Sequence, residues 1–199
     1  MCGIAGIMYK GAESVFDTGE ALIRMLDGCQ HRGPDSTGFA LYGKALPGEL
    51  KLRFFLGTAS DSETAIDTIR QRLLVLKAVI LDESEIGDNY RVTVRYAGDV
   101  QKLAYEMEHT AKVISIGTSL EIVKDVGSAH EVDDRYAVHS YRGTHGLGHV
   151  RLATESDVKP EASHPFWATG FADVAIVHNG QITNYWKMRR RLEQRGFEF

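Results

Sequence analysis

The first residues of the chain, Met1-Cys2-Gly3, place a cysteine directly behind the initiator methionine. Removal of Met1 would give Cys2 both a thiol and a free α-amine, which are a nucleophile and a base within one residue. The amine titrates at about 8 and the thiol at about 8.5, so a fraction of the amine accepts protons at neutral pH. We expect the thiol proton to reach the amine through a bridging water. Met-Cys also arises by chance wherever translation starts, and this second interpretation stays open.

An arginine near the expected end of a strand is the second candidate. Arg151 lies in the segment Gly148-His-Val-Arg-Leu-Ala-Thr154, in a strand that we expect over 146–153. The planar guanidinium fork matches the two oxygens of a carboxylate, and the hydroxyl of Thr154 is close in sequence. These two residues predict a carboxylate-binding site, with a structural salt bridge as the alternative.

An Asn-Gly pair is the third candidate. Asn179 and Gly180 follow a short apolar strand expected over 174–177 and precede a basic helix expected over 185–195. A side-chain amide and an unshielded glycine N–H can both point at one developing negative oxygen, as in an oxyanion hole. Asn-Gly is also a common hairpin turn, but a helix rather than a returning strand follows here.

A turn-rich segment, His31-Arg-Gly-Pro-Asp-Ser36, joins a helix expected over 14–27 to a strand expected over 39–42. Its first interpretation is a plain turn, because proline, glycine and aspartate favour turns. Its functional interpretation is a backbone carbonyl at Gly33 that holds the N-terminal amine, with Arg32 bracing the loop.

The remaining histidines and cysteines show no metal-ligand pattern. His31, His149 and His178 each lie among strand or loop residues, and we interpret them as hydrogen-bonded structural residues. Cys2 and Cys29 have neither metal-ligand spacing nor the pattern of a disulfide framework. We therefore expect no metal and no cofactor in this chain, and a reducing cytoplasm in which Cys2 stays a thiol.

The composition is that of an ordinary globular protein. The 199 residues are 43% apolar and 25% charged, with a net charge of −4 and both signs interspersed. Nothing in this balance indicates nucleic acid or an anionic membrane as a partner. The longest apolar run, 73–81, is too short to span a bilayer, and we expect no signal peptide.

The hydrophobic pattern predicts two units. In the first strand we expect Ile4 and Ile7 to anchor the backbone in a core, while glycines allow close approach. We expect residues 1–43 and 135–199 to form one domain and residues 44–134 to form an inserted α+β subdomain. The subdomain elements that we expect are strand 50–56, helix 61–77, strand 90–96, helix 99–110, strand 112–116 and strand 120–126.

Four motifs in this order resemble the class II glutamine amidotransferases, which are N-terminal-nucleophile (Ntn) hydrolases. The motifs are Met1-Cys-Gly-Ile-Ala-Gly, His31-Arg-Gly-Pro-Asp-Ser, Gly148-His-x-Arg-x-Ala-Thr and Val177-His-Asn-Gly-x-Ile-x-Asn-Tyr. Jointly they are specific, and the resemblance covers about 1–43 and 138–199 but nothing of the insertion. It implies an α+β fold, a four-layer αββα sandwich in which the chain as given looks truncated at its C-terminus.

The resemblance also implies roles for residues. Cys2 would be the nucleophile and its α-amine the base, while Asn179 and Gly180 would form the oxyanion hole. Arg151, with help near Thr154, would bind the α-carboxylate of glutamine. Attack on the side-chain amide would give a thioester and ammonia, and water would then release glutamate. The acidic residue that receives the ammonium of glutamine in this family is expected beyond Phe199, so we expect this stretch alone to bind glutamine poorly.

The class II glutamine amidotransferases include several subgroups, and the motifs fit some of them better than others. Leu152 and Glu155 stand where the sugar-phosphate branch has Trp and His, so that branch is disfavoured. The long insertion and the Ile-Thr-Asn-Tyr variant of the last motif most resemble amidotransferase subunits of glutamate synthase-like and N-methylglutamate synthase-like complexes. There, a separate flavin-dependent synthase subunit would use the ammonia.

Three other hypotheses stay open beside that subgroup. The chain would be a catalytically silent scaffold or regulatory subunit with the same fold, the amidotransferase half of an asparagine synthetase-like enzyme, or an Ntn amidase acting on another amide.

Overall fold

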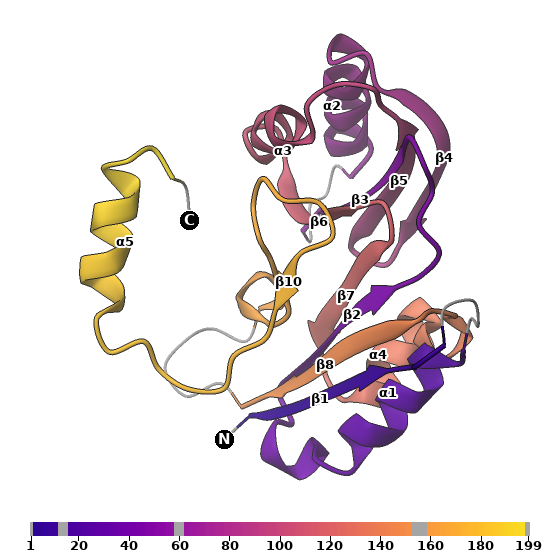
Figure 1. Cartoon of the computed structure of the whole chain (residues 1–199), viewed down its shortest axis with the longest axis vertical. Helices are drawn as coiled ribbons and strands as arrows, with labels where there is room; N and C mark the ends of the chain where they lie inside the picture. The colour runs from indigo at the N-terminus through magenta and orange to yellow at the C-terminus, as the bar shows by residue number, and fades with distance from the viewer. Residues whose placement is uncertain (1, 12–15, 58–61, 153–158, 198–199) are drawn as a thin grey trace.

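The computed structural model describes residues 2–11, 16–57, 62–152 and 159–197. Two four-stranded antiparallel sheets and their covering helices make up a mixed α/β fold (Figure 1). The strands are β1 (Gly3–Met8), β2 (Ser36–Tyr42), β3 (Glu49–Phe55), β4 (Val79–Ile86), β5 (Asn89–Arg95), β6 (Lys112–Gly117), β7 (Leu120–Val126), β8 (His145–Arg151), β9 (Phe166–Trp167) and β10 (Ala175–Ile176). The α-helices are α1 (Thr18–Asp27), α2 (Ser62–Val75), α3 (Val100–Glu108), α4 (Ala129–Tyr136) and α5 (Tyr185–Glu193), and the short 3-10 helices are η1 (Gln30–Arg32), η2 (Val138–Ser140) and η3 (Pro160–Ala162).

The first sheet has the strand order β1-β8-β2-β7, so the first strand of the chain pairs with a strand almost 150 residues later. Helices α1 and α4 pack on one of its faces (Figure 1). The apolar spacing of α1 explains this packing, because Leu22, Ile23 and Leu26 recur on one side of the helix and are buried. The opposite face of this sheet is therefore left for other contacts.

Strand β1 shows which of its side chains enter the core. Gly3 and Ala5 are buried on the α1 side, and Ile7 packs against the same core. Ile4 points to the opposite face and is 44% exposed, because successive strand side chains alternate between faces. The expectation that Ile4 anchors the strand in a core was wrong.

The second sheet has the order β4-β5-β3-β6 and is covered by α2 and α3 (Figure 1). Its core consists of alternate residues such as Leu52, Phe54 and Val92 packed against Ile69 and Leu103 of the helices. The sequence analysis missed β4, so its element order for this region was incomplete. The reason is that β4 is an edge strand rich in acidic residues, which shows no clean alternation of apolar and polar side chains.

Helix α4 was also missed, although it carries a readable start signal. Ser128 accepts from the backbone of Glu131, and the Glu131 carboxylate accepts from the backbone of Ser128, which forms a capping box. Strand β7 falls within the predicted insertion 44–134 and α4 begins within it, yet β7 pairs with β2 and α4 packs on the first sheet. The division into two domains stays a prediction.

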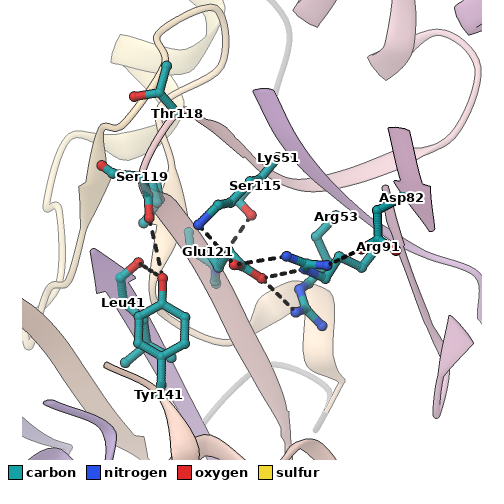
Figure 2. Close-up of polar contacts among 12 residues, drawn as sticks. Leu41, Lys51, Arg53, Asp82, Arg91, Ser115, Thr118, Ser119, Glu121 and Tyr141 are labelled. Atoms are coloured by element: carbon teal, nitrogen blue, oxygen red, sulfur yellow. Dashed lines mark hydrogen bonds and ion pairs between the residues drawn. The ribbon is translucent and has the colours of Figure 1, made fainter. Parts of the chain in front are cut away.

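A buried carboxylate joins the two sheets. Glu121 of β7 lies within 3.3 Å of Lys51, 3.3 Å of Arg53 and 2.8 Å of Arg91, which project from β3 and β5 (Figure 2). Burial alone would raise the pKa of Glu121, but the hydrogen bond and charge of Arg91, together with Arg53 and Lys51, lower it to about 2. The glutamate therefore stays ionised as the anionic centre of a cationic cluster.

Helix α5 stands apart from both sheets (Figure 1), and none of its residues is buried. Within the described ranges, no helix combines the length and the apolar character that crossing a membrane requires.

Candidate active site

The pairing of β1 with β8 directs Cys2 toward Arg151, on the face of the first sheet that α1 and α4 do not cover. Strand β1 pairs with β8 so that Gly3 faces Val150, and continuing this antiparallel register by one residue brings Cys2 opposite Arg151. Val150 enters the core under α1, so its neighbours on either side, His149 and Arg151, belong to the other face. Cys2 shares that face with Ile4, because residues two positions apart in a strand point to the same side.

The Asn-Gly turn reaches the same end of the sheet from a distant part of the chain. The side-chain amide of Asn179 donates a hydrogen bond to the backbone carbonyl of Cys2 at 2.9 Å. The residue before it, His178, presents its carbonyl to Nε2 of His149 at 3.2 Å. A Cβ on Gly180 would lie 3.1 Å from Nε2 of His178, so a larger residue would crowd this turn. The structure thus brings Cys2, Arg151 and Asn179 together.

Gly33 packs directly on the strand that carries Arg151. A Cβ at Gly33 would lie only 2.4 Å from the backbone carbon of Val150, so only glycine fits this close approach. The Gly33 carbonyl, expected to hold the N-terminal amine, accepts a hydrogen bond from Gln30 at 2.8 Å. A carbonyl oxygen has two lone pairs, so this contact leaves one for a second donor.

The structure does not test the roles predicted for Arg32 and Thr154. Arg32 ends η1 and its side chain is exposed, so its role in bracing the loop stays a prediction. Thr154 lies outside the described residues.

A loop that the sequence analysis did not single out covers the site face beside β2 and β7. Lys124, buried on β7, donates from Nζ to the carbonyls of Ser163 at 2.9 Å and Pro165 at 3.3 Å. The hydroxyl of Ser163 donates to that of Ser36 at 2.8 Å. A Cβ at Gly38 would meet the carbonyl oxygen of His164 at 2.1 Å. The 163–166 loop therefore rests on the sheet itself, and a glycine within β2 is the signal that indicates it.

The rings of two histidines meet at a tilt, His164 from this loop and His149 from β8 beside the Asn-Gly turn. The rings of His149 and His164 are 4.6 Å apart, and the edge of His164 meets Phe166 at 4.5 Å. Burial lowers the pKa of His149 to about 4, and the nearby charge of Arg151 adds to the effect. Burial also lowers the pKa of His164 to about 4, with a contribution from His149. Both imidazoles are therefore neutral at physiological pH.

These two histidines predict a loss of stability in mild acid. In the unfolded chain they protonate near their ordinary value of about 6.5, whereas the folded chain resists protonation until about pH 4. Their contribution is thus complete above pH 6.5 and is lost as the pH falls toward 4, by up to about 3 kcal/mol for His149. Urea titrations at pH 7, 6, 5 and 4 should show this decline, and His149→Phe should reduce it. An equally steep decline in His149→Phe would contradict the assignment.

The described residues hold no group of three or more histidine, cysteine or acidic side chains placed to bind a metal ion. What the site does offer is a thiol, a guanidinium and an amide donor on one sheet face. Such a set can combine nucleophilic attack with carboxylate binding and oxyanion stabilisation.

Comparisons with known proteins indicate one family. A glutamine amidotransferase domain model matches residues 120–199. A protein of Methanothermobacter thermautotrophicus with a glutamine amidotransferase name is 38% identical over the whole of this chain and 67% of its own length. The glutamine amidotransferase-like protein GlxB of Rhizobium meliloti is 34% identical over the whole of this chain and 65% of its own length.

Other similarities cover only part of the chain. A glutamine–fructose-6-phosphate aminotransferase of Aeropyrum pernix is 44% identical over 39% of this chain and 12% of its own length. The mixed α/β fold with its antiparallel sheets is consistent with a glutamine amidotransferase domain. The chain belongs to the glutamine amidotransferase family. The whole chain aligns with the proteins of Methanothermobacter thermautotrophicus and Rhizobium meliloti, and it spans about two thirds of the length of each.

Proposed function

We propose that this chain hydrolyses the side-chain amide of glutamine through Cys2, once Met1 has been removed, and supplies ammonia to a partner synthase. The observation that carries the proposal is the placement of Cys2 between Arg151, its neighbour across the β1–β8 pair, and Asn179, which contacts its carbonyl. Family membership supports glutamine as the substrate.

In the proposed reaction, the thiol proton of Cys2 moves to the free α-amine through a water molecule. The sulfur attacks the side-chain carbonyl carbon of glutamine and forms a C–S bond, and the C–N bond breaks as the nitrogen takes up a proton and leaves as ammonia. Water then attacks the thioester, the C–S bond breaks, and glutamate leaves with the thiol restored.

The other residues would bind the substrate and stabilise charge. Arg151 would hold the α-carboxylate with two parallel hydrogen bonds. Asn179 has two amide N–H donors, so its contact to Cys2 leaves one for the oxyanion, next to the N–H of Gly180. The carbonyl of Gly33 would accept from the N-terminal amine. Glutamine would thus be held at its carboxylate while its amide faces the sulfur.

The finer assignments belong to the same proposal. The first sheet would belong to a four-layer αββα sandwich and the second sheet to the inserted α+β subdomain, and the chain would need no cofactor of its own. The ammonia would pass to a separate synthase subunit of the glutamate synthase-like kind, one that carries a flavin.

Labelling with a diazoketone analogue of glutamine tests this proposal. We expect one label per chain, on Cys2, after intact mass has shown that Met1 is absent, and none in Cys2→Ser. Cys29 is a matched internal control, because burial raises the pKa of its thiol and leaves less reactive thiolate. Glutamine should compete with the label. Absence of label, or equal label on both cysteines, would contradict the proposal and favour a catalytically silent subunit.

A further inference from the structure

The turn that carries Asn179 is held by two contacts to two different strands. Asn179 donates to the carbonyl of Cys2 on the β1 side at 2.9 Å, and His149 of β8 contacts the carbonyl of His178 at 3.2 Å. His178, Asn179 and Gly180 are themselves exposed. Because packing does not fix an exposed turn, these two hydrogen bonds determine where its donors point.

The direction of the His149 contact follows from its chemistry. A backbone carbonyl only accepts, so Nε2 of His149 must carry the hydrogen. In a neutral imidazole this leaves Nδ1 without a proton, and Nδ1 of His149 is buried with no hydrogen-bond partner among the described residues. The lowered pKa of His149 agrees with this neutral tautomer.

The ring of His149 cannot easily swing away from this contact. Its side chain is 1% exposed, and its face lies against His164 at 4.6 Å. The loop that carries His164 is fixed in turn by Lys124, which donates to the carbonyls of Ser163 and Pro165 and lies over the ring of Phe166 at 4.9 Å. A continuous set of contacts therefore runs from β7 through His164 and His149 to the Asn-Gly turn.

We infer that His149 is a positioning residue, which holds the 178–180 turn so that the N–H donors of Asn179 and Gly180 face the carbonyl oxygen of the amide that Cys2 attacks. The inference rests on the proposed function and adds to it a role for a histidine that contacts neither the substrate nor the reacting atoms. His164 and Lys124 act behind it as the support of the ring.

Two amide substitutions of the same polarity separate positioning from general stability. In His149→Gln the side-chain nitrogen reaches about as far as Nε2 of histidine and can donate to the His178 carbonyl. In His149→Asn the amide is one methylene shorter and cannot. His145, the first residue of the same strand, stacks on Tyr42 at 4.1 Å away from the site, so His145→Gln and His145→Asn are matched controls.

Glutaminase kinetics on the complete native protein give the decisive comparison. Loss of one oxyanion donor typically lowers kcat about 100-fold or more, so a misplaced turn in His149→Asn should lower kcat about 10- to 100-fold. KM for glutamine should change less than about 3-fold, because Arg151 still binds the carboxylate. His149→Gln should recover most of the loss. Both His145 variants should match the wild type within about 2-fold.

Each result decides between stated alternatives. A kcat loss confined to His149→Asn, with normal melting and with normal alkylation of Cys2 by iodoacetamide, supports positioning. Equal activity of His149→Asn and wild type overturns the inference while the proposed function stands. Equal losses in both His149 variants, with KM also raised, indicate a merely structural residue and overturn it as well. A wild-type protein with neither glutaminase activity nor Cys2 labelling refutes the proposed function itself, and the inference falls with it.

Discussion

Replacing Arg151 with glutamine should raise KM for glutamine by about 100-fold or more while kcat falls much less. A bidentate, charge-assisted pair contributes roughly 3 to 5 kcal/mol, and its loss weakens the ground state and the transition state alike. Arg151 is 7% exposed at the end of β8, where a substrate carboxylate would be largely dry. The interaction would therefore be screened little by solvent.

Arg151→Lys refines this experiment, because lysine keeps the charge but lacks the fork. We expect its KM to lie between those of the wild type and Arg151→Gln. Arg95→Gln is the control, since Arg95 is an exposed residue with a 3.6 Å surface ion pair to Glu49. Melting temperatures separate binding from folding. Unchanged KM in a folded, active Arg151→Gln variant would show that this guanidinium does not bind the substrate.

The residues of the site could be predicted from the sequence, but their arrangement could not. Cys2 is recognisable by its position behind Met1, and Asn179 by the Asn-Gly pair between a strand and a helix. The β1–β8 register, which brings Cys2 opposite Arg151, joins segments almost 150 residues apart. Periodicity identifies strands, whereas pairing between distant strands depends on the packing of the whole sheet.

The error at Ile4 has the same origin. An apolar residue in a strand predicts burial on one face, but the pattern does not say which face α1 covers. Gly3 and Ala5 are small and still enter that core, because α1 packs close to the sheet, while the larger Ile4 faces the site side. A core assignment made from hydrophobicity alone therefore selects the wrong face here.

The position of the 163–166 loop could not be predicted from the sequence. His164-Pro165 is readable as a loop, because the residue before proline avoids helical conformation. Nothing local indicates that this loop would lie on β2 or that Lys124 would bind two of its carbonyls. The sequence did contain an indirect signal, since Gly38 is a glycine within a strand and such a residue often marks the close approach of another backbone.

Replacing Glu121 with glutamine should destabilise the protein by about 3 kcal/mol or more, even though the shape of the side chain is kept. Glu121 is the carboxylate that faces Lys51, Arg53 and Arg91 between the two sheets (Figure 2). Removing one member of a buried ion pair typically costs about 3 to 5 kcal/mol, because a buried charge is left uncompensated. Arg53 is 5% exposed and its Nε and Nη1 already have no hydrogen-bond partner among the described residues.

Urea denaturation of a double-mutant cycle measures this effect. Adding Arg53→Met should restore part of the stability lost in Glu121→Gln, because it removes the buried positive charge that Glu121→Gln leaves unpaired. Glu193→Gln is the matched control: Glu193 of α5 accepts a hydrogen bond from Arg189 at 2.8 Å at the surface, and such a pair contributes at most about 1 kcal/mol. Additive losses in the cycle would show that Glu121 and Arg53 do not interact.

The pH dependence provides an independent check on the charge of Glu121. Its pKa is about 2 in the folded chain and about 4.5 when unperturbed, so its contribution is complete above pH 4.5 and is lost as the pH falls toward 2. The stability difference between wild type and Glu121→Gln should therefore be constant from pH 8 to 5 and shrink below pH 4.5. Since Lys51, Arg53 and Arg91 belong to the second sheet and Glu121 to the first, this difference measures the coupling between the two sheets. A difference that stays constant down to pH 3 would show that the carboxylate contributes through shape and not through charge.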